Sequence, residues 1–186
     1  MRKCAVLLVW FLLLAGCSSQ PKEMEAGLEL RSKLLQATAC SFTARITADY
    51  GDKIHTFTMD CHANSRGDVA FTIMEPDVIS GITGNLSGDG GNMTFDDHAL
   101  HFELMAEDQL SPVSAPWIFL KTLRSGYITS AGREDGRILL SIDDSYEEDP
   151  LRLDIWLNSE NIPEEAQILF EGRRILSVSV EHFTIL

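Results

Sequence analysis

Cys40-Ser-Phe-Thr-Ala-Arg-Ile-Thr-Ala-Asp-Tyr50 is the stretch of sequence that decides the fold. Every second residue in it is apolar, and the same alternation runs from His55 to Ala63. Strict alternation over such lengths predicts β-strands with one buried face. The short segment between the two runs contains Gly51 and Asp52, which are typical of a turn. The two runs are therefore predicted to pair as a β-hairpin.

Two cysteines lie on the apolar face of this hairpin. If Tyr50 and Gly51 form the centre of the turn, Cys40 faces Cys61 across the strands. If the turn shifts by one residue, the two cysteines are diagonal neighbours. A disulfide between Cys40 and Cys61 would stabilise the fold by ~2–4 kcal/mol. Two buried free thiols, which also pack well, are the alternative.

The remaining sequence adds two helices and further strands. An amphipathic helix is predicted over residues 26–38, and a second helix begins near Ser114 and ends at Gly126. Alternating runs of hairpin length fill the rest of the chain, which favours antiparallel pairing. The predicted fold class is α+β, a curved antiparallel sheet forming an unclosed half-barrel with helices packed on one face.

The N-terminus reads as a targeting segment. Arg2 and Lys3 precede an apolar run that is too short to cross a bilayer, and Leu14-Ala-Gly-Cys17 follows. This pattern resembles the lipobox of bacterial lipoproteins, in which the cysteine takes acyl chains such as palmitate. The resemblance implies a signal peptide over residues 1–16, lipidation at Cys17, a tether over 17–25 and a single domain over 26–186. The mature protein is then extracytoplasmic and lipid-anchored to the cell membrane, or to the outer membrane in a host that has one.

The net charge and the absence of known catalytic motifs argue against several classes of function. With 15 Lys and Arg against 28 Asp and Glu, the chain has a net charge of -13, which argues against a nucleic-acid partner. Nucleotide-binding fingerprints and the nucleophile elbow are absent from the sequence. We therefore expect no catalytic residues, no cofactor and a protein that is not an enzyme; a hydrolase whose carboxylates come together only in the folded chain is the alternative. No metal site is expected, because the histidines and the acidic turns lack metal-ligand spacing.

The order of these segments resembles a known family. It includes the signal, an N-terminal helix, the hairpin beginning Ser-Phe-Thr-Ala-Arg-Ile-Thr, and a turn reading Gly-Asp-Gly-Gly-Asn-Met-Thr-Phe. A mid-chain helix and the ending Ile-Pro-Glu-Glu-Ala-Gln-Ile-Leu-Phe complete it. This is similar to the LolA/LolB-like lipoprotein-localisation superfamily, and within it to the GerS-like germination lipoproteins of Firmicutes. The resemblance implies either a lipid or other hydrophobic ligand, including an acyl chain, or an envelope protein partner such as a cell-wall hydrolase of the spore cortex.

The large apolar side chains on the predicted inner face have two interpretations. They fill an ordinary core, or some of them line the half-barrel cavity that the resemblance implies. The candidate lining residues are Phe42, Phe57, Met59, Phe71, Phe102, Trp117 and Phe170.

Overall fold

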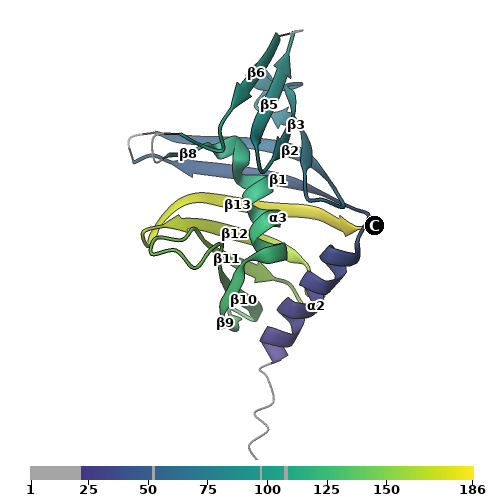
Figure 1. Cartoon of the computed structure of the whole chain (residues 1–186), viewed down its shortest axis with the longest axis vertical. Coiled ribbons are helices and arrows are strands. Elements are labelled where there is room, and N and C mark those ends of the chain that lie inside the picture. The colour runs from purple at the N-terminus through teal and green to yellow at the C-terminus, as the bar shows by residue number, and fades with distance from the viewer. Residues whose placement is uncertain (1–21, 52, 97, 107–108) are drawn as a thin grey trace, which may run out of the picture.

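The computed structural model describes residues 22–51, 53–96, 98–106 and 109–186. Eleven antiparallel strands form one curved sheet (Figure 1). In chain order they are β1 (Ala39–Asp49), β2 (Ile54–Asn64), β3 (Val69–Glu75), β4 (Thr83–Ser87), β5 (Gly90–Phe95), β6 (His98–Phe102), β9 (Tyr127–Glu134), β10 (Arg137–Asp143), β11 (Arg152–Leu157), β12 (Pro163–Phe170) and β13 (Arg173–Ile185). A separate two-stranded ladder joins β7 (Met105–Ala106) to β8 (Gln109–Leu110), and short 3-10 turns lie at η1 (Asp77–Ile79) and η2 (Pro112–Ser114).

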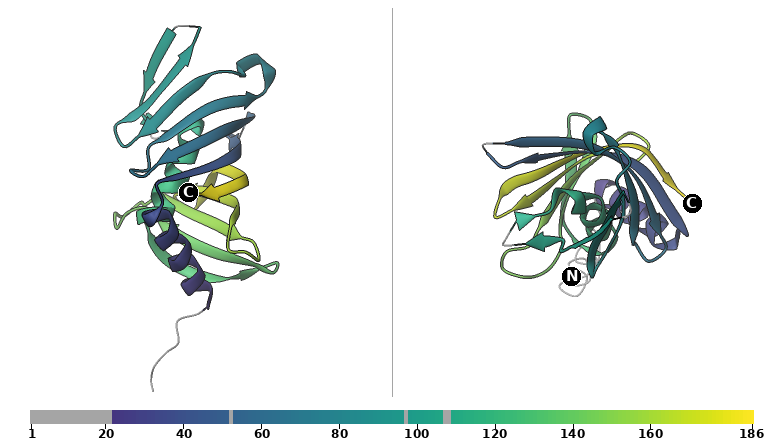
Figure 2. Two further views of the ribbon diagram at one scale, coloured as in Figure 1. Left: turned by 90° about the vertical axis from the view of Figure 1, so that its right-hand side faces the viewer. Right: turned by 90° about the horizontal axis from the view of Figure 1, so that it is seen from above.

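The sheet is open, and its two edges are β6 and β9. The strand order is β6-β5-β4-β3-β2-β1-β13-β12-β11-β10-β9, so the last strand of the chain pairs with the first. The sheet curls around the helices without closing (Figure 2). The predicted fold class, an unclosed antiparallel half-barrel with helices on one face, is confirmed.

The opening hairpin forms as the alternation predicts. Cys40, Phe42, Ala44, Ile46 and Ala48 are buried on the concave face of β1, and their neighbours along the strand face the convex side. Phe42 pairs with Cys61, and Cys40 pairs with Ala63. The hairpin thus takes the shifted register, in which the two cysteines are diagonal neighbours. Both thiols are free and buried.

Helix α2 (Lys22–Gln36) begins before the predicted residue 26, and Lys22 to Glu25 form its first turn. Its apolar face buries Ala26, Leu30 and Leu34 against β9, β10 and the second helix. At Gly27 an added Cβ would come within 2.8 Å of Leu140 in β10. Glycine there lets the helix backbone approach the sheet closely.

Helix α3 (Ala115–Ser125) fills the concave side of the sheet. Phe119 is fully buried, and its ring packs against Phe42 of β1 and Phe183 of β13, with centroids 5.6 and 6.3 Å away. Arg31 of α2 donates from Nε to the carbonyl of Leu123, which joins the two helices. The predicted end at Gly126 is confirmed. Ser114 precedes the helix, but its hydroxyl bonds to the carbonyl of Ser111 and does not cap the helix.

The two helices leave one end of the sheet uncovered. They lie over β1 and β9–β13, whereas β4–β6 extend beyond them (Figures 1 and 2). We call β3–β6, residues 69–102, the distal lobe. Its buried residues Val69, Phe71, Ile73 and Leu86 join the main core. Farther along the same face the apolar side chains become exposed, and this change defines the candidate site.

Candidate functional site

An apolar groove lies on the concave face of the distal lobe. The register places Met93 of β5 between Gly84 of β4 and Leu100 of β6, so these positions share a face with buried Phe71. Ile82 and Phe95 continue the surface, and together the side chains bound a cavity of about 620 Å³. Phe95 is 49% exposed and Leu100 is 58% exposed. The groove is therefore a preformed apolar surface that faces solvent.

Two glycines allow aromatic rings to pack close to the backbone of this face. A Cβ at Gly84 would come within 2.5 Å of the Phe71 ring, and a Cβ at Gly91 would overlap the Phe102 ring. Each aromatic ring therefore lies against the glycine of the neighbouring strand, where a side chain would not fit. The Gly-rich sequence of residues 81–91 thus provides room for rings from β3 and β6.

The lobe is strongly acidic. Residues 69–102 contain five Asp and Glu, the wider stretch 67–120 contains nine, and neither stretch contains Lys or Arg. Asp96 and His98 border the groove at the β5–β6 turn. This charge distribution repels anions from the groove and attracts cations.

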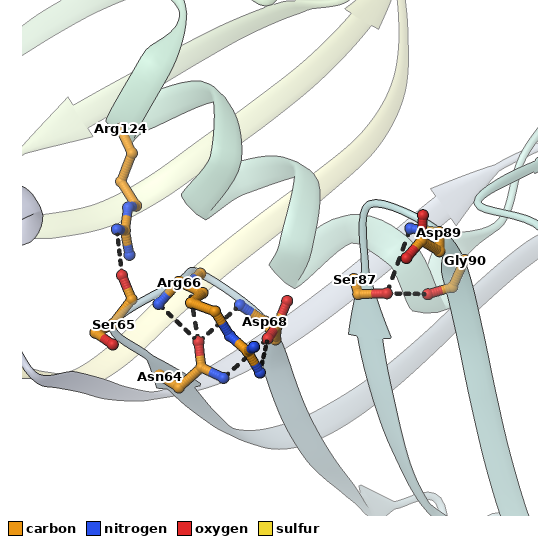
Figure 3. Close-up of polar contacts among 9 residues, drawn as sticks. Asn64, Ser65, Arg66, Asp68, Ser87, Asp89, Gly90 and Arg124 are labelled. Atoms are coloured by element: carbon orange, nitrogen blue, oxygen red, sulfur yellow. Dashed lines mark hydrogen bonds and ion pairs between the residues drawn. The ribbon is translucent and has the colours of Figure 1, made fainter.

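Arg124 of α3 connects the helix to the β2–β3 turn beside the distal lobe (Figure 3). Its Nη2 donates to the carbonyl of Ser65 over 2.7 Å. Asn64 closes the turn, because its Oδ1 accepts from the backbone N–H groups of Arg66, Gly67 and Asp68. In the β4–β5 turn, Ser87 bonds to Asp89 and Gly90. The Arg124 bond joins α3 to the β2–β3 turn, and the bonds of Asn64 and Ser87 stabilise their own turns.

The seven residues proposed from sequence as cavity lining lie elsewhere. Phe42, Phe57, Met59 and Phe71 are buried in the core, and Phe102 and Trp117 are half-buried against it. Phe170 is half-buried near the end of β12. The groove instead uses Ile82, Met93, Phe95 and Leu100, which sequence reasoning missed. The alternation of Met93 and Phe95 signals a strand, but a local pattern does not tell whether the apolar face of that strand is covered.

The remaining sequence predictions concern the cysteines, a metal site and the membrane. Cys17 and the signal segment lie outside the described residues. Burial raises the pKa of Cys40 to about 12 and also raises the pKa of Cys61. Among the described residues, no three His, Cys, Asp or Glu side chains are grouped so that they could hold a metal ion. None of the helices in the described ranges has the length and apolar character that a bilayer-spanning segment needs.

The chain matches no family model and no curated protein. Among solved structures it is similar to a LolA superfamily protein from Nitrosomonas europaea, with 8% identity, a TM-score of 0.46, and coverage of 86% of this chain and 93% of that chain. It is similar to a putative outer membrane lipoprotein-sorting protein domain from Vibrio parahaemolyticus, with 9% identity, a TM-score of 0.45, and coverage of 88% and 92%. A chain from the structure of the CwlD amidase from Clostridioides difficile in complex with the GerS lipoprotein is also similar, with 12% identity, a TM-score of 0.46, and coverage of 90% and 98%.

Proposed function

We propose that this chain is a lipid-anchored, extracytoplasmic binding protein without enzymatic activity, which holds the apolar part of an amphiphile in the groove of the distal lobe. The observation that carries the proposal is the groove itself. Exposed Phe95 and Leu100 sit beside partly buried Met93 and Ile82 over a preformed cavity. An apolar concave surface of this size favours a hydrophobic ligand.

The proposed anchor sets the orientation of the groove. Cys17 precedes the first described helical residue, Lys22, by five residues, which span at most about 18 Å when extended. Lipidation at Cys17 would therefore hold the start of α2 near the membrane. The distal lobe lies at the opposite end of the molecule from the start of α2 (Figure 1). The groove would then face away from the anchoring membrane and receive its ligand from the extracytoplasmic space.

Affinity and head-group preference follow from the chemistry of the groove. Burying eight methylenes of an acyl chain contributes about 6 kcal/mol, which corresponds to a Kd of tens of micromolar. Asp96 at the border and the absence of Lys and Arg from residues 67–120 disfavour an anionic head group. The expected ligand is therefore neutral, zwitterionic or cationic.

The test uses the mature chain without its lipid, residues 18–186, and calorimetric titration with palmitoyl-lysophosphatidylcholine. We expect Leu100→Asp to abolish binding, because it places a carboxylate in the groove. Leu35→Asp is the matched control, since Leu35 is 56% exposed on α2, away from the groove. Palmitoyl-lysophosphatidylglycerol should bind more weakly than the zwitterionic lipid, most clearly at low salt. Equal binding by folded Leu100→Asp and by the wild type would contradict the assignment.

A protein partner is the second candidate, and it is favoured by the position of the groove beside the free edge strand β6. The exposed backbone of an edge strand can pair with a strand of another protein. A partner that fits this surface is apolar with basic flanks, since the lobe is acidic. Capture of one stoichiometric envelope protein, lost in Leu100→Asp and retained in Leu35→Asp, would support this candidate. It would replace the lipid assignment if titration shows no lipid binding.

A further inference from the structure

We propose a second binding site, for an uncharged glycan chain, on the convex face of β2–β6. This face lies on the other side of the sheet from the apolar groove. Two rows of side chains cross its five strands, and most of these side chains are hydroxyls, amides and imidazoles. The proposal depends on neither the lipid anchor nor the groove.

Strand register defines the two rows. His62, Ala70, Asn85, Asn92 and His101 are paired in sequence across β2, β3, β4, β5 and β6. The adjacent row consists of Asp60, Thr72, Thr83, Thr94 and Ala99. Neighbours within a row are separated by one strand spacing, about 4.8 Å, and the two rows are ~7 Å apart along the strands.

A hollow lies between these rows. It has a volume of about 280 Å³, and its lining includes His62, Thr72, Thr83, Asn85 and Thr94. Ala70 is the one residue of the first row with a side chain as small as a methyl group, and it lies between His62 and Asn85. The short side chain leaves room above the sheet that the longer flanking side chains enclose.

Most polar groups of the hollow are available to a ligand, although His62 is paired with Asp60, with 3.3 Å between Nε2 and Oδ2. Across the described ranges, the side chains of Thr72, Thr83, Asn85 and Thr94 form no hydrogen bond within the protein. Asn92 is oriented, since Nδ1 of His101 donates to its Oδ1 over 3.0 Å. This leaves amide and hydroxyl donors and acceptors at regular spacing on an exposed face.

Charge distinguishes this surface from the rest of the convex face. Over β10–β13 the convex side carries ion pairs, including Arg137–Glu165 and Arg152–Asp143. The two rows contain no Lys, Arg or Glu, and Asp60 at one end is their single acid. Acidic side chains such as Asp77 and Asp89 lie in the connecting turns of the distal lobe. Polyanions are therefore repelled, whereas an uncharged polymer is not.

A glycan with hydroxyl and acetamido groups fits these features. Asn amides can donate to and accept from an acetamido group at once, and Thr hydroxyls can do the same with sugar hydroxyls. In an extended β-1,4-linked chain, successive sugars advance by a distance close to one strand spacing. A short oligosaccharide lying along the rows would thus present one sugar to each strand.

The test is titration of residues 18–186 with the β-1,4-linked tetramer of N-acetylglucosamine, followed by amide NMR shifts. We expect shifts confined to β2–β6. Ala70→Arg fills the hollow and should weaken binding by about tenfold or more. Ser179→Arg is the matched control, because Ser179 is exposed on the convex face of β13, outside the rows. Its affinity should stay within about twofold of the wild type, a difference under ~0.5 kcal/mol.

Thr83→Val is a second, nearly isosteric variant that removes one hydroxyl, and it should weaken binding several-fold. Leu100→Asp, which changes only the groove on the other face, should bind the tetramer like the wild type. No binding by the wild type at millimolar tetramer would overturn the proposal. Equal losses in Ala70→Arg and Ser179→Arg, shifts outside β2–β6, or tight binding of polygalacturonate would also overturn it.

Discussion

The two ends of this sheet have similar strand patterns but different surroundings. Over β1 and β9–β13, α2 and α3 cover the concave face, and residues such as Phe42, Leu140 and Ile155 are almost completely buried. In the distal lobe the same alternation leaves Phe95 and Leu100 about half exposed. The difference teaches that alternation specifies which face is apolar, while the covering elements decide whether that face becomes core or binding surface.

The reactivity of cysteine thiols should differ more strongly between the two ends of the sheet than any other property. Cys40 and Cys61 are buried, and burial raises the pKa of both. We expect neither to react with a thiol reagent at pH 8 in the folded protein, and both to react in urea. A cysteine introduced by Leu100→Cys should react at once. Rapid native labelling of Cys40 would contradict the burial, and failure of both thiols to react in urea without reductant would indicate a disulfide.

The same pKa shift makes stability depend on alkaline pH. An unfolded thiol ionises near its ordinary pKa of 9.0, whereas folded Cys40 stays protonated until about 12. The unfolded state therefore binds fewer protons over this range, and the free energy of unfolding should fall as pH rises from 9 towards 12. Urea denaturation of the wild type and Cys40→Ala at about pH 8 and about pH 10.5 measures the effect. The variant should lose less stability than the wild type between these two conditions.

Core truncation should give the next largest effect. Phe42 is 1% exposed and packs edge-to-face on Phe119, so Phe42→Ala should lower the free energy of unfolding by about 3–5 kcal/mol. Phe95→Ala in the groove is the comparison and should cost less than about 1 kcal/mol. Equal losses in urea denaturation would show that the distal lobe packs as tightly as the covered end.

Two glycine substitutions, one at each end of the sheet, should have smaller effects on stability. Gly84→Ala places a Cβ against the backbone carbonyl of Asn92 and the Phe71 ring, and it should destabilise the lobe by about 1–3 kcal/mol. Gly132→Ala in β9 meets nothing within 4 Å and should be neutral or stabilise by less than about 1 kcal/mol. Hydrogen exchange should show faster exchange in β4–β6 for the first variant and no change for the second.

The link between α3 and the base of the lobe should have the smallest effect. Arg124→Ala removes the hydrogen bond to Ser65 and should cost about 1 kcal/mol, with faster amide exchange in residues 64–68. Arg66→Ala, which loses an exposed ion pair with Asp68, should cost close to zero. A larger loss for Arg66→Ala would reverse the assigned roles of the two arginines.

Much of the fold could be predicted from local patterns. The hairpin over residues 40–63, the helix ending at Gly126 and the strands after it are all signalled by spacing and turn residues. The register was harder, because the choice between a turn centred on residues 50–51 and one shifted by a residue depends on packing that local sequence does not contain. The start of α2 is harder to predict, because Lys22, Glu23 and Glu25 are charged and only Met24 among these four residues is apolar.

The sequence by itself determined the alternation, the turns, the lipobox-like segment and the acidity of residues 67–120, since each is a property of neighbouring residues. Tertiary structure alone decided which apolar residues are exposed. Phe42 and Phe95 both stand on the apolar face of a strand, but α3 covers one and leaves the other open. Tertiary structure also places Asn85 opposite Asn92 and Thr83 opposite Thr94 on neighbouring strands. Burial and cross-strand alignment depend on the packing of segments far apart in the chain, and a local pattern does not contain that information.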